Sequence, residues 1–257
     1  MLIKEFYTDK LHTRVFDTLE AMGQCAGKEI AQKLRELLAS RDQVKIMFGA
    51  APSQNETLAT LVNAGGIDWS RVNAFHMDEY AGLPKDHPAG FGNYLSRHIF
   101  SLLPFRSVNL INGGASDIDA EAARYSELLE KMPLDICVLG IGENGHIAFN
   151  DPHLADFRDP FKVKLVELDE RCRMQQVHDG CFECLDAVPR CALTVTVPAM
   201  FAAGTMICSV PAKTKAEAVK RTIEGPISAQ CPASVMRLHS DARLYTDADA
   251  ASQIIGL

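Results

Sequence analysis

The chain has 257 residues, 47% of them hydrophobic and 23% charged, so it can bury a sizeable core as one large α/β domain or two small ones. Its net charge of -7 argues against binding to nucleic acid or an anionic membrane, because no surplus of cations exists to neutralise phosphates at scale. A small anionic ligand is compatible with this charge, since one or two local donors suffice to hold it.

The amino-terminal stretch has no unbroken apolar run and no small-residue cleavage site, so we predict no signal peptide and a cytoplasmic protein. The longest apolar stretch, 192–212, has the length of a membrane span. Pro198, Gly204 and Pro211 interrupt it, and its β-branched residues gather at both ends. This pattern predicts a strand, a turn and a second strand. No contact with a membrane is therefore expected.

Eight cysteines occur, and without a secretion signal we expect reduced thiols. One group has a spacing that zinc could use: His178, Cys181, Cys184 and Cys191. A structural zinc site usually needs a second clean pair of ligands at a suitable distance. Cys191 instead opens an apolar strand and is expected to point inward. We therefore predict no metal site.

Short apolar runs rich in β-branched residues alternate with segments of helical spacing. Strands are predicted at 44–50, 72–77, 107–113, 134–142, 191–197, 205–210 and 242–246. Helical spacing covers 16–40, 119–132 and 214–225. Apolar strands between helices indicate a Rossmann-like, mostly parallel sheet with helices on both faces. No repeat, low-complexity run or linker composition interrupts the chain, so one α/β domain over 1–257 is predicted.

Sheets of this kind bind ligands at the carboxyl ends of their strands, so the residues after each apolar run are of most interest. After 44–50 the sequence reads APSQNETL, and this small-residue turn into a helix offers N–H groups that suit phosphate. Ser53, Gln54 and Asn55 are candidate donors. Ser53 could equally cap the helix, with Glu56 completing a capping box. The glycine and lysine pattern of a Walker loop is absent.

Two carboxylates, Asp78 and Glu79, follow the strand predicted at 72–77. A charged group next to a buried strand is costly unless it is paired or functional. Partial desolvation can raise the pKa of such a carboxyl into the range of a general base. Asp78 is therefore a candidate base, with capping of the next turn as the alternative.

Three glycines surround a histidine in LGIGENGHIAFNDP, 139–152. Asn144, His146 and Asp151 are close enough in sequence to converge, with a carboxylate orienting the imidazole. A structural histidine in a tight turn is an equal alternative. Farther along, Lys215 opens the helix predicted at 214–225, where it opposes the helix dipole. A nearby anion would explain Lys215; a solvated surface lysine is the alternative, and Lys213 competes for the same role.

Two motifs, MDEYAGLPKDHPAGF and GIGENGHIAFNDP, resemble the glucosamine-6-phosphate deaminase/isomerase family, which is grouped with the 6-phosphogluconolactonases. Their counterparts in the deaminases read M-D-E-Y-x-G-L and G-x-G-x-(D/N)-G-H-I-x-F-N-E-P. The resemblance extends over about 44–245. It implies an isomerase/deaminase that acts on a small-molecule sugar phosphate without metal or organic cofactor. It also implies a homo-oligomer.

The resemblance also implies roles for individual residues. Asp78 would move a proton from C2 to C1 of the open-chain sugar, after which the C2 amine leaves as ammonia. His146 would assist ring opening, supported by Asn144 and Asp151. Lys215 would bind phosphate, and 151–189 would form a lid. Two alternatives stay open, a sugar-lactone phosphate hydrolase that uses His146 without Asp78, and a non-catalytic sugar-phosphate sensor.

The chain departs from the family pattern at the phosphate and lid contacts. PSQNET (52–57) replaces a T-G-G-T-P loop, so the glycines that let backbone approach phosphate are missing. A lid arginine has no clear match, because Gln176 or Val177 falls near its place. Asp151 stands where glutamate is usual. The resemblance therefore supports the reaction class more firmly than the substrate.

Overall fold

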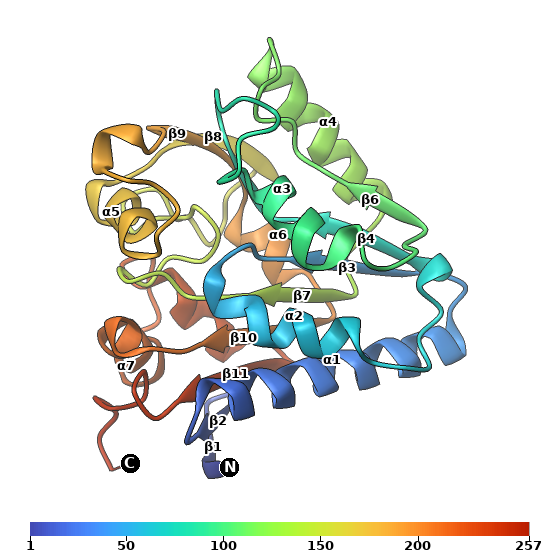
Figure 1. Cartoon of the computed structure of the whole chain (residues 1–257). Helices are drawn as coiled ribbons and strands as arrows, with labels where there is room; N and C mark the ends of the chain where they lie inside the picture. Colours follow the sequence, from blue (N-terminus) through green and yellow to red (C-terminus); the bar gives the residue numbers. More distant parts are fainter. Residues whose placement is uncertain (257) are drawn as a thin grey trace.

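An eight-stranded sheet forms the centre of the protein in the computed structural model, which describes residues 1–256 (Figure 1). Its strand order is β1-β2-β11-β10-β7-β3-β4-β6, and every neighbouring pair is parallel except the hairpin of β1 and β2. The strands are β1 (Leu2–Thr8), β2 (Leu11–Phe16), β3 (Val44–Phe48), β4 (Val72–His76), β6 (Ser107–Asn109), β7 (Ile136–Leu139), β10 (Thr205–Val210) and β11 (Ala242–Asp247).

Helices cover both faces of this sheet (Figure 1). One face packs against α1 (Leu19–Ser40) and α2 (Asn55–Val62), and the other against α4 (Ile118–Lys131), α6 (Val197–Phe201) and α7 (Ala216–Glu224). Successive strand residues alternate between the two cores, as when Ile46 joins the α1 side and Met47 the α4 side. The predicted fold class, a mostly parallel α/β sheet covered on both faces, is confirmed.

Small residues let α1 and α2 approach closely. A Cβ atom at Gly23 would lie 2.3 Å from the Glu56 Cβ, and one at Gly27 would lie 2.7 Å from the Thr57 carbonyl oxygen. Thr18 caps α1 by accepting a hydrogen bond from the Ala21 N–H at 3.1 Å. The packing fixes α2, whose amino-terminal turn borders the cavity described below.

A second, antiparallel sheet forms part of the wall of that cavity. Its order is β5 (Asp78–Tyr80), β9 (Cys191–Val195) and β8 (Val163–Glu167). The strand predicted at 191–197 therefore exists, but β9 pairs with β5 and β8 and lies outside the parallel sheet. Two short helices complete the fold, α3 (Phe91–Leu95) and α5 (Glu170–His178). Asp78 opposes Thr194 in the second sheet, so its backbone is held by strand pairing.

The apolar stretch 192–212 forms β9, α6 and β10, so a short helix replaces the predicted turn between two strands. In the part of the chain that the structure describes, no helix is both long and apolar enough to cross a membrane. The hairpin of β1 and β2 was not predicted, and the strand predicted at 107–113 ends at Asn109. All eight cysteines are free thiols.

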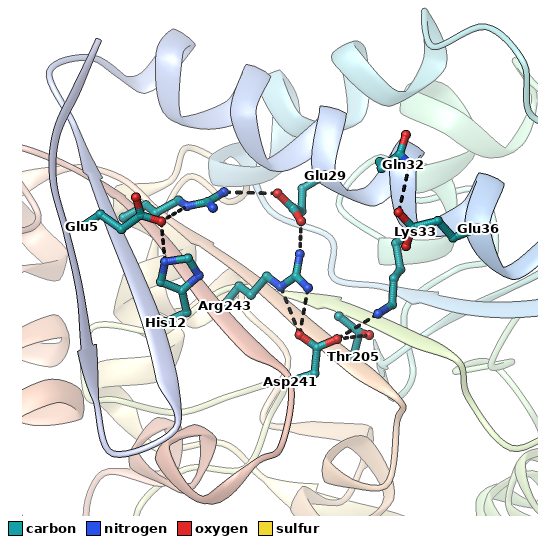
Figure 2. A network of polar contacts seen from close by, with 10 residues as sticks. Glu5, His12, Glu29, Gln32, Lys33, Glu36, Thr205, Asp241 and Arg243 are labelled. Atoms are coloured by element: carbon teal, nitrogen blue, oxygen red, sulfur yellow. Dashed lines mark hydrogen bonds and ion pairs between the residues drawn. The ribbon is translucent and has the colours of Figure 1, made fainter.

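A network of ionic contacts ties the hairpin to α1 and to the amino ends of β10 and β11 (Figure 2). Glu29 on α1 pairs with Arg14 and Arg243, and Lys33 reaches Asp241 at 2.9 Å. The Thr205 hydroxyl also donates to Asp241, at 2.8 Å. These contacts lie at the amino ends of the parallel strands, opposite the edge where this fold class places ligands. We read the network as structural.

Candidate active site

A cavity of about 380 Å³ opens at the carboxyl ends of the parallel strands. The carboxyl ends of five of those strands, or the turns that follow them, line it. These residues are Gly49–Gln54 after β3, Met77 and Asp78 after β4, Gly140–Gly142 after β7, Pro211 and Ala212 after β10, and Asp247 at the end of β11. Residues 175, 176 and 179 of the segment 151–189 close another side. The cavity therefore collects most of the residues that the sequence singles out.

Asp78 and Glu79 are adjacent buried carboxylates that play different parts. Glu79 accepts three backbone hydrogen bonds, from Tyr80 and Phe91 at 3.0 Å and from Gly92 at 2.9 Å, and so anchors the start of α3. Asp78 lines the cavity, and its carboxylate accepts no hydrogen bond from residues 1–256. Burial, and the neighbouring Glu79, raise the pKa of Asp78 well above its ordinary value. The alternative in which Asp78 caps a turn is not observed.

His146 lies in a turn that requires glycine at two positions. Gly145 has a φ of 93°, and a Cβ at Gly142 would lie 2.2 Å from the imidazole ring. The Nδ1 atom of His146 is 3.0 Å from the Asp151 carboxylate, but it is not aligned for a hydrogen bond. Such contacts often tighten only when substrate binds. The ring borders the cavity that also holds Asp78.

A hydrogen-bond network behind His146 fixes Asp151. Asn144 donates to Asp151 at 2.9 Å and to Asp169 at 3.0 Å, and its oxygen accepts from the His146 N–H at 3.0 Å. The Asp169 N–H donates to the other Asp151 oxygen at 3.2 Å. Burial acts to raise the pKa of Asp151, but His146, Asn144 and the Asp169 N–H together hold that pKa at about 2. Asp151 is therefore an anion that can orient His146 and stabilise its protonated form.

Asp169 joins this network to α5. Its carboxylate caps α5 by accepting from the Cys172 N–H at 2.6 Å and also accepts from Asn144. Asp169 is not among the site residues predicted from the sequence, although an aspartate directly before a helix is a recognisable cap. The start of α5 and the orientation of Asp151 are thus held by one side chain.

Replacing Asp169 with serine is expected to separate its two roles, the capping of α5 and the positioning of Asp151 through Asn144. Serine caps helices as well as aspartate does, but it is too short to accept from Asn144. We expect kcat to fall about tenfold, roughly the loss of one hydrogen bond to a charged group, with little change in Tm. The matched control is Asp117→Ser at the cap of α4, where the same substitution should leave kcat unchanged. A shifted pH profile of kcat in Asp169→Ser alone supports positioning; parallel losses in both variants would contradict it.

The predicted phosphate donors divide into two groups. Ser53, Gln54 and Lys215 line the cavity, whereas Asn55 is exposed and its side chain accepts a hydrogen bond from the Tyr94 hydroxyl. Ser53 does not cap α2, because α2 has no side-chain cap hydrogen bond; the Ser53 hydroxyl instead accepts from the Gln54 amide at 3.2 Å. That amide also donates to the Ser209 carbonyl at 3.1 Å.

Lys215 is buried, with 7% of its surface exposed, so the alternative of a solvated surface lysine is wrong. Its ammonium group makes no hydrogen bond or ion pair with the residues described, 1–256. Burial lowers the pKa of Lys215, and the nearby Asp179 and Glu143 act in the opposite direction. The competitor Lys213 is exposed and does not line the cavity.

Two groups of side chains bring metal-ligating atoms within 4.8 Å of one another. One joins His146, Asp151 and Cys172, and the other joins Asp151, His153 and Asp169. Both share Asp151, whose two oxygens already accept the hydrogen bonds from Asn144 and the Asp169 N–H. Within residues 1–256, the cysteine-rich spacing at 178–191 forms no such group.

The fold and the site together define an α/β protein with a buried carboxylate, Asp78, and a histidine, His146, in one cavity at the carboxyl edge of its sheet. Comparison with known families gives the same result, because residues 17–245 match the model for glucosamine-6-phosphate isomerases/6-phosphogluconolactonase. The chain belongs to this family.

Relatives within the family are similar along most of their length. The glucosamine-6-phosphate deaminase of Listeria monocytogenes is 35% identical over 227 residues, which cover 88% of this chain and 95% of the relative. A solved monomeric glucosamine-6-phosphate deaminase is 30% identical, has a TM-score of 0.85, and is matched over 95% of this chain and 99% of its own. The 6-phosphogluconolactonase of Thermotoga maritima shares the fold at 16% identity, with a TM-score of 0.75 over 93% of this chain and 100% of its own.

Proposed function

We propose that the protein converts an amino-sugar phosphate into a ketose phosphate and ammonia, as a glucosamine-6-phosphate deaminase does. The observation that carries this proposal is the buried Asp78 carboxylate, which accepts no hydrogen bond from residues 1–256 and lines the same cavity as His146, whose Nδ1 atom lies 3.0 Å from the Asp151 carboxylate. Neighbouring titratable groups with different environments are a frequent sign of acid–base catalysis. The similarity to named deaminases at 35% and 30% identity supports the same reaction.

Ring opening comes first in the proposed reaction. His146 moves a proton between the C1 hydroxyl and the ring oxygen, so that the pyranose opens to the aldehyde. The Asp151 anion stabilises the imidazolium that forms during this transfer. Asn144 holds Asp151 in place through its amide.

Proton transfer along the carbon chain follows. Asp78 removes the C2 proton, the electron pair forms a C1–C2 double bond, and the C1 oxygen takes up a proton. Asp78 then delivers its proton to C1, which leaves an imine at C2. Water adds to that imine, ammonia departs, and the ketose forms; one water is consumed for each ammonia released. A pKa raised by burial makes Asp78 a stronger base than an ordinary aspartate.

Lys215 and the Ser53 hydroxyl supply the proposed contacts to the phosphate, whereas the amide donors of Gln54 are already engaged by Ser53 and Ser209. Lys215 is the one ammonium group in the cavity lining formed by residues 1–256. We propose that 151–189 acts as a lid, because its residues 175, 176 and 179 close the cavity. A cytoplasmic location accords with this metabolic role. Assembly into a homo-oligomer stays a prediction, and the solved relative at 30% identity is described as a monomer.

An ammonia-release assay with glucosamine 6-phosphate tests the proposal. We expect stoichiometric ammonia and a ketose phosphate as products. Hydrolysis of 6-phosphogluconolactone without ammonia release would instead indicate the lactonase reaction. Binding of sugar phosphates with no turnover would indicate a sensor.

A further inference from the structure

Three side chains at one side of the cavity bring a nitrogen, an oxygen and a sulfur atom together. The Nδ1 atom of His146, a carboxylate oxygen of Asp151 and the Sγ atom of Cys172 all lie within 4.8 Å of one another. All three residues are buried, with 7% of His146, 1% of Cys172 and 0% of Asp151 exposed. Imidazole nitrogen, carboxylate oxygen and thiolate sulfur are the ligand atoms that zinc takes in proteins. The group therefore has the chemistry of a zinc site.

One atom of this group lacks a partner. The Nδ1 atom of His146 is buried and makes no hydrogen bond with residues 1–256, although it lies 3.0 Å from the Asp151 carboxylate. A buried nitrogen without a hydrogen bond is costly. A metal ion bound at Nδ1 would remove that cost, because the nitrogen lone pair would then be coordinated.

The hydrogen bonds to Asp151 leave it able to bind a metal ion. Asn144 donates to one of its oxygens and the Asp169 N–H to the other, but each carboxylate oxygen has two acceptor sites and keeps one. Hydrogen bonds of this kind orient ligating carboxylates in metal sites. The overlapping group of Asp151, His153 and Asp169 is less suitable, because both Asp169 oxygens are engaged and His153 is exposed.

The Cys172 thiol selects the kind of metal ion. Magnesium and calcium prefer oxygen ligands, whereas zinc binds sulfur. Burial, together with the Asp151 and Asp169 carboxylates, raises the pKa of Cys172 well above its ordinary value, so the thiol holds its proton in the metal-free protein. When zinc binds, the S–H bond breaks, a Zn–S bond forms and the proton passes to solvent. Ligand atoms around a tetrahedral zinc ion lie about 3.5 Å apart, so a small contraction of the group suffices.

We propose that His146, Asp151 and Cys172 bind a zinc ion that reversibly inhibits the protein, with water as the fourth ligand. The inference rests on the proposed deaminase reaction and adds regulation to the same site. Zinc occupies the Nδ1 atom and offsets the charge of Asp151, so the imidazolium needed for ring opening cannot form. Asp151 and Cys172 do not line the cavity, so the substrate still enters it. Zinc therefore lowers kcat and changes KM little.

Cobalt(II) is the probe for binding, because a thiolate-bound cobalt ion has a charge-transfer absorption band that the metal-free protein lacks. We expect this band when cobalt is added to EDTA-treated protein, and its loss when zinc displaces the cobalt. Cys172→Ala and the closer mimic Cys172→Ser should each lose the band. Both should also raise the dissociation constant for zinc, measured by calorimetry, at least about tenfold.

Cys184→Ala is the matched control, since Cys184 is an exposed thiol on the same segment, 151–189. The cobalt band and the zinc dissociation constant should stay unchanged in this variant. A band that depends on Cys184 and not on Cys172 would place the ion at the cysteine-rich spacing of 178–191 and overturn the proposal. Absence of the band in the wild type would overturn it as well.

Inhibition is measured as ammonia release from glucosamine 6-phosphate, with free zinc set by a chelating buffer. At about ten times the wild-type dissociation constant, zinc should lower kcat about tenfold by mass action, and EDTA should restore it. The same zinc should leave Cys172→Ala within about twofold of its own zinc-free kcat, because its site is at most half occupied. Equal inhibition of both proteins would overturn the proposal. If the wild type releases no ammonia even without zinc, the proposed function is wrong, and the cobalt band still supports or excludes the metal site.

Discussion

Replacing Asp78 with asparagine is expected to lower kcat about 10²- to 10⁴-fold, the usual contribution of a positioned acid–base group. Asparagine has the same shape, so the cavity should keep its form, but an amide cannot accept the C2 proton. The measurement is the rate of ammonia release under saturating glucosamine 6-phosphate. Turnover within threefold of the wild type would show that another group transfers the proton.

The same substitution is expected to preserve or raise stability. Because burial raises the pKa of Asp78, the native state holds its proton at pH values where the unfolded chain has released it. The wild-type contribution of this group to stability therefore falls as the pH rises above the ordinary aspartate value of 3.8. Asp78→Asn removes that fall, so its Tm at neutral pH should equal or exceed the wild-type value. Thermal melts across this pH range separate lost chemistry from lost folding.

His146→Gln is expected to lower kcat about 10²- to 10³-fold, because ring opening loses its proton carrier. Glutamine can still occupy the space beside Gly142 but cannot shuttle a proton. The residual rate should be limited by spontaneous ring opening. Ammonia release and the rate of anomer interconversion, followed together by NMR, give the measurement.

His12→Gln is the control for His146→Gln. His12 pairs with Glu5 in the network of Figure 2. That network lies at the amino ends of the parallel strands, whereas the cavity lies at their carboxyl ends. We expect its loss to leave kcat within twofold of the wild type. Equal losses in the two variants, or no loss in His146→Gln, would contradict the role assigned to His146.

The parallel sheet could be predicted because each buried strand is a continuous apolar run, as in VKIMF at β3. The local pattern could not place β9, because a strand buried on both faces reads the same in either sheet. The hairpin of β1 and β2 was also missed. β1 is largely exposed, so its sequence lacks the apolar run on which the other strands were predicted.

Part of the site could also be predicted from the sequence. Asp78, Asn144, His146 and Asp151 follow the ends of apolar strands, and topology brings such ends together. Asp169 and Asp179 lie in 151–189, where hydrophobic periodicity is weak. Their positions depend on tertiary contacts between α5 and the 140–151 turn, as in the bond from the Glu143 N–H to Gln175. Sequence spacing alone carries no information on such contacts.

The most direct test of the proposed chemistry follows the hydrogen on C2. Glucosamine 6-phosphate with deuterium at C2 would be incubated with the protein, and the products examined by NMR. We predict ammonia release with a ketose 6-phosphate whose deuterium has moved to C1, in part exchanged with solvent, and formation of both products about 10²- to 10⁴-fold more slowly with Asp78→Asn. Consumption of the sugar with deuterium retained at C2 would contradict the account.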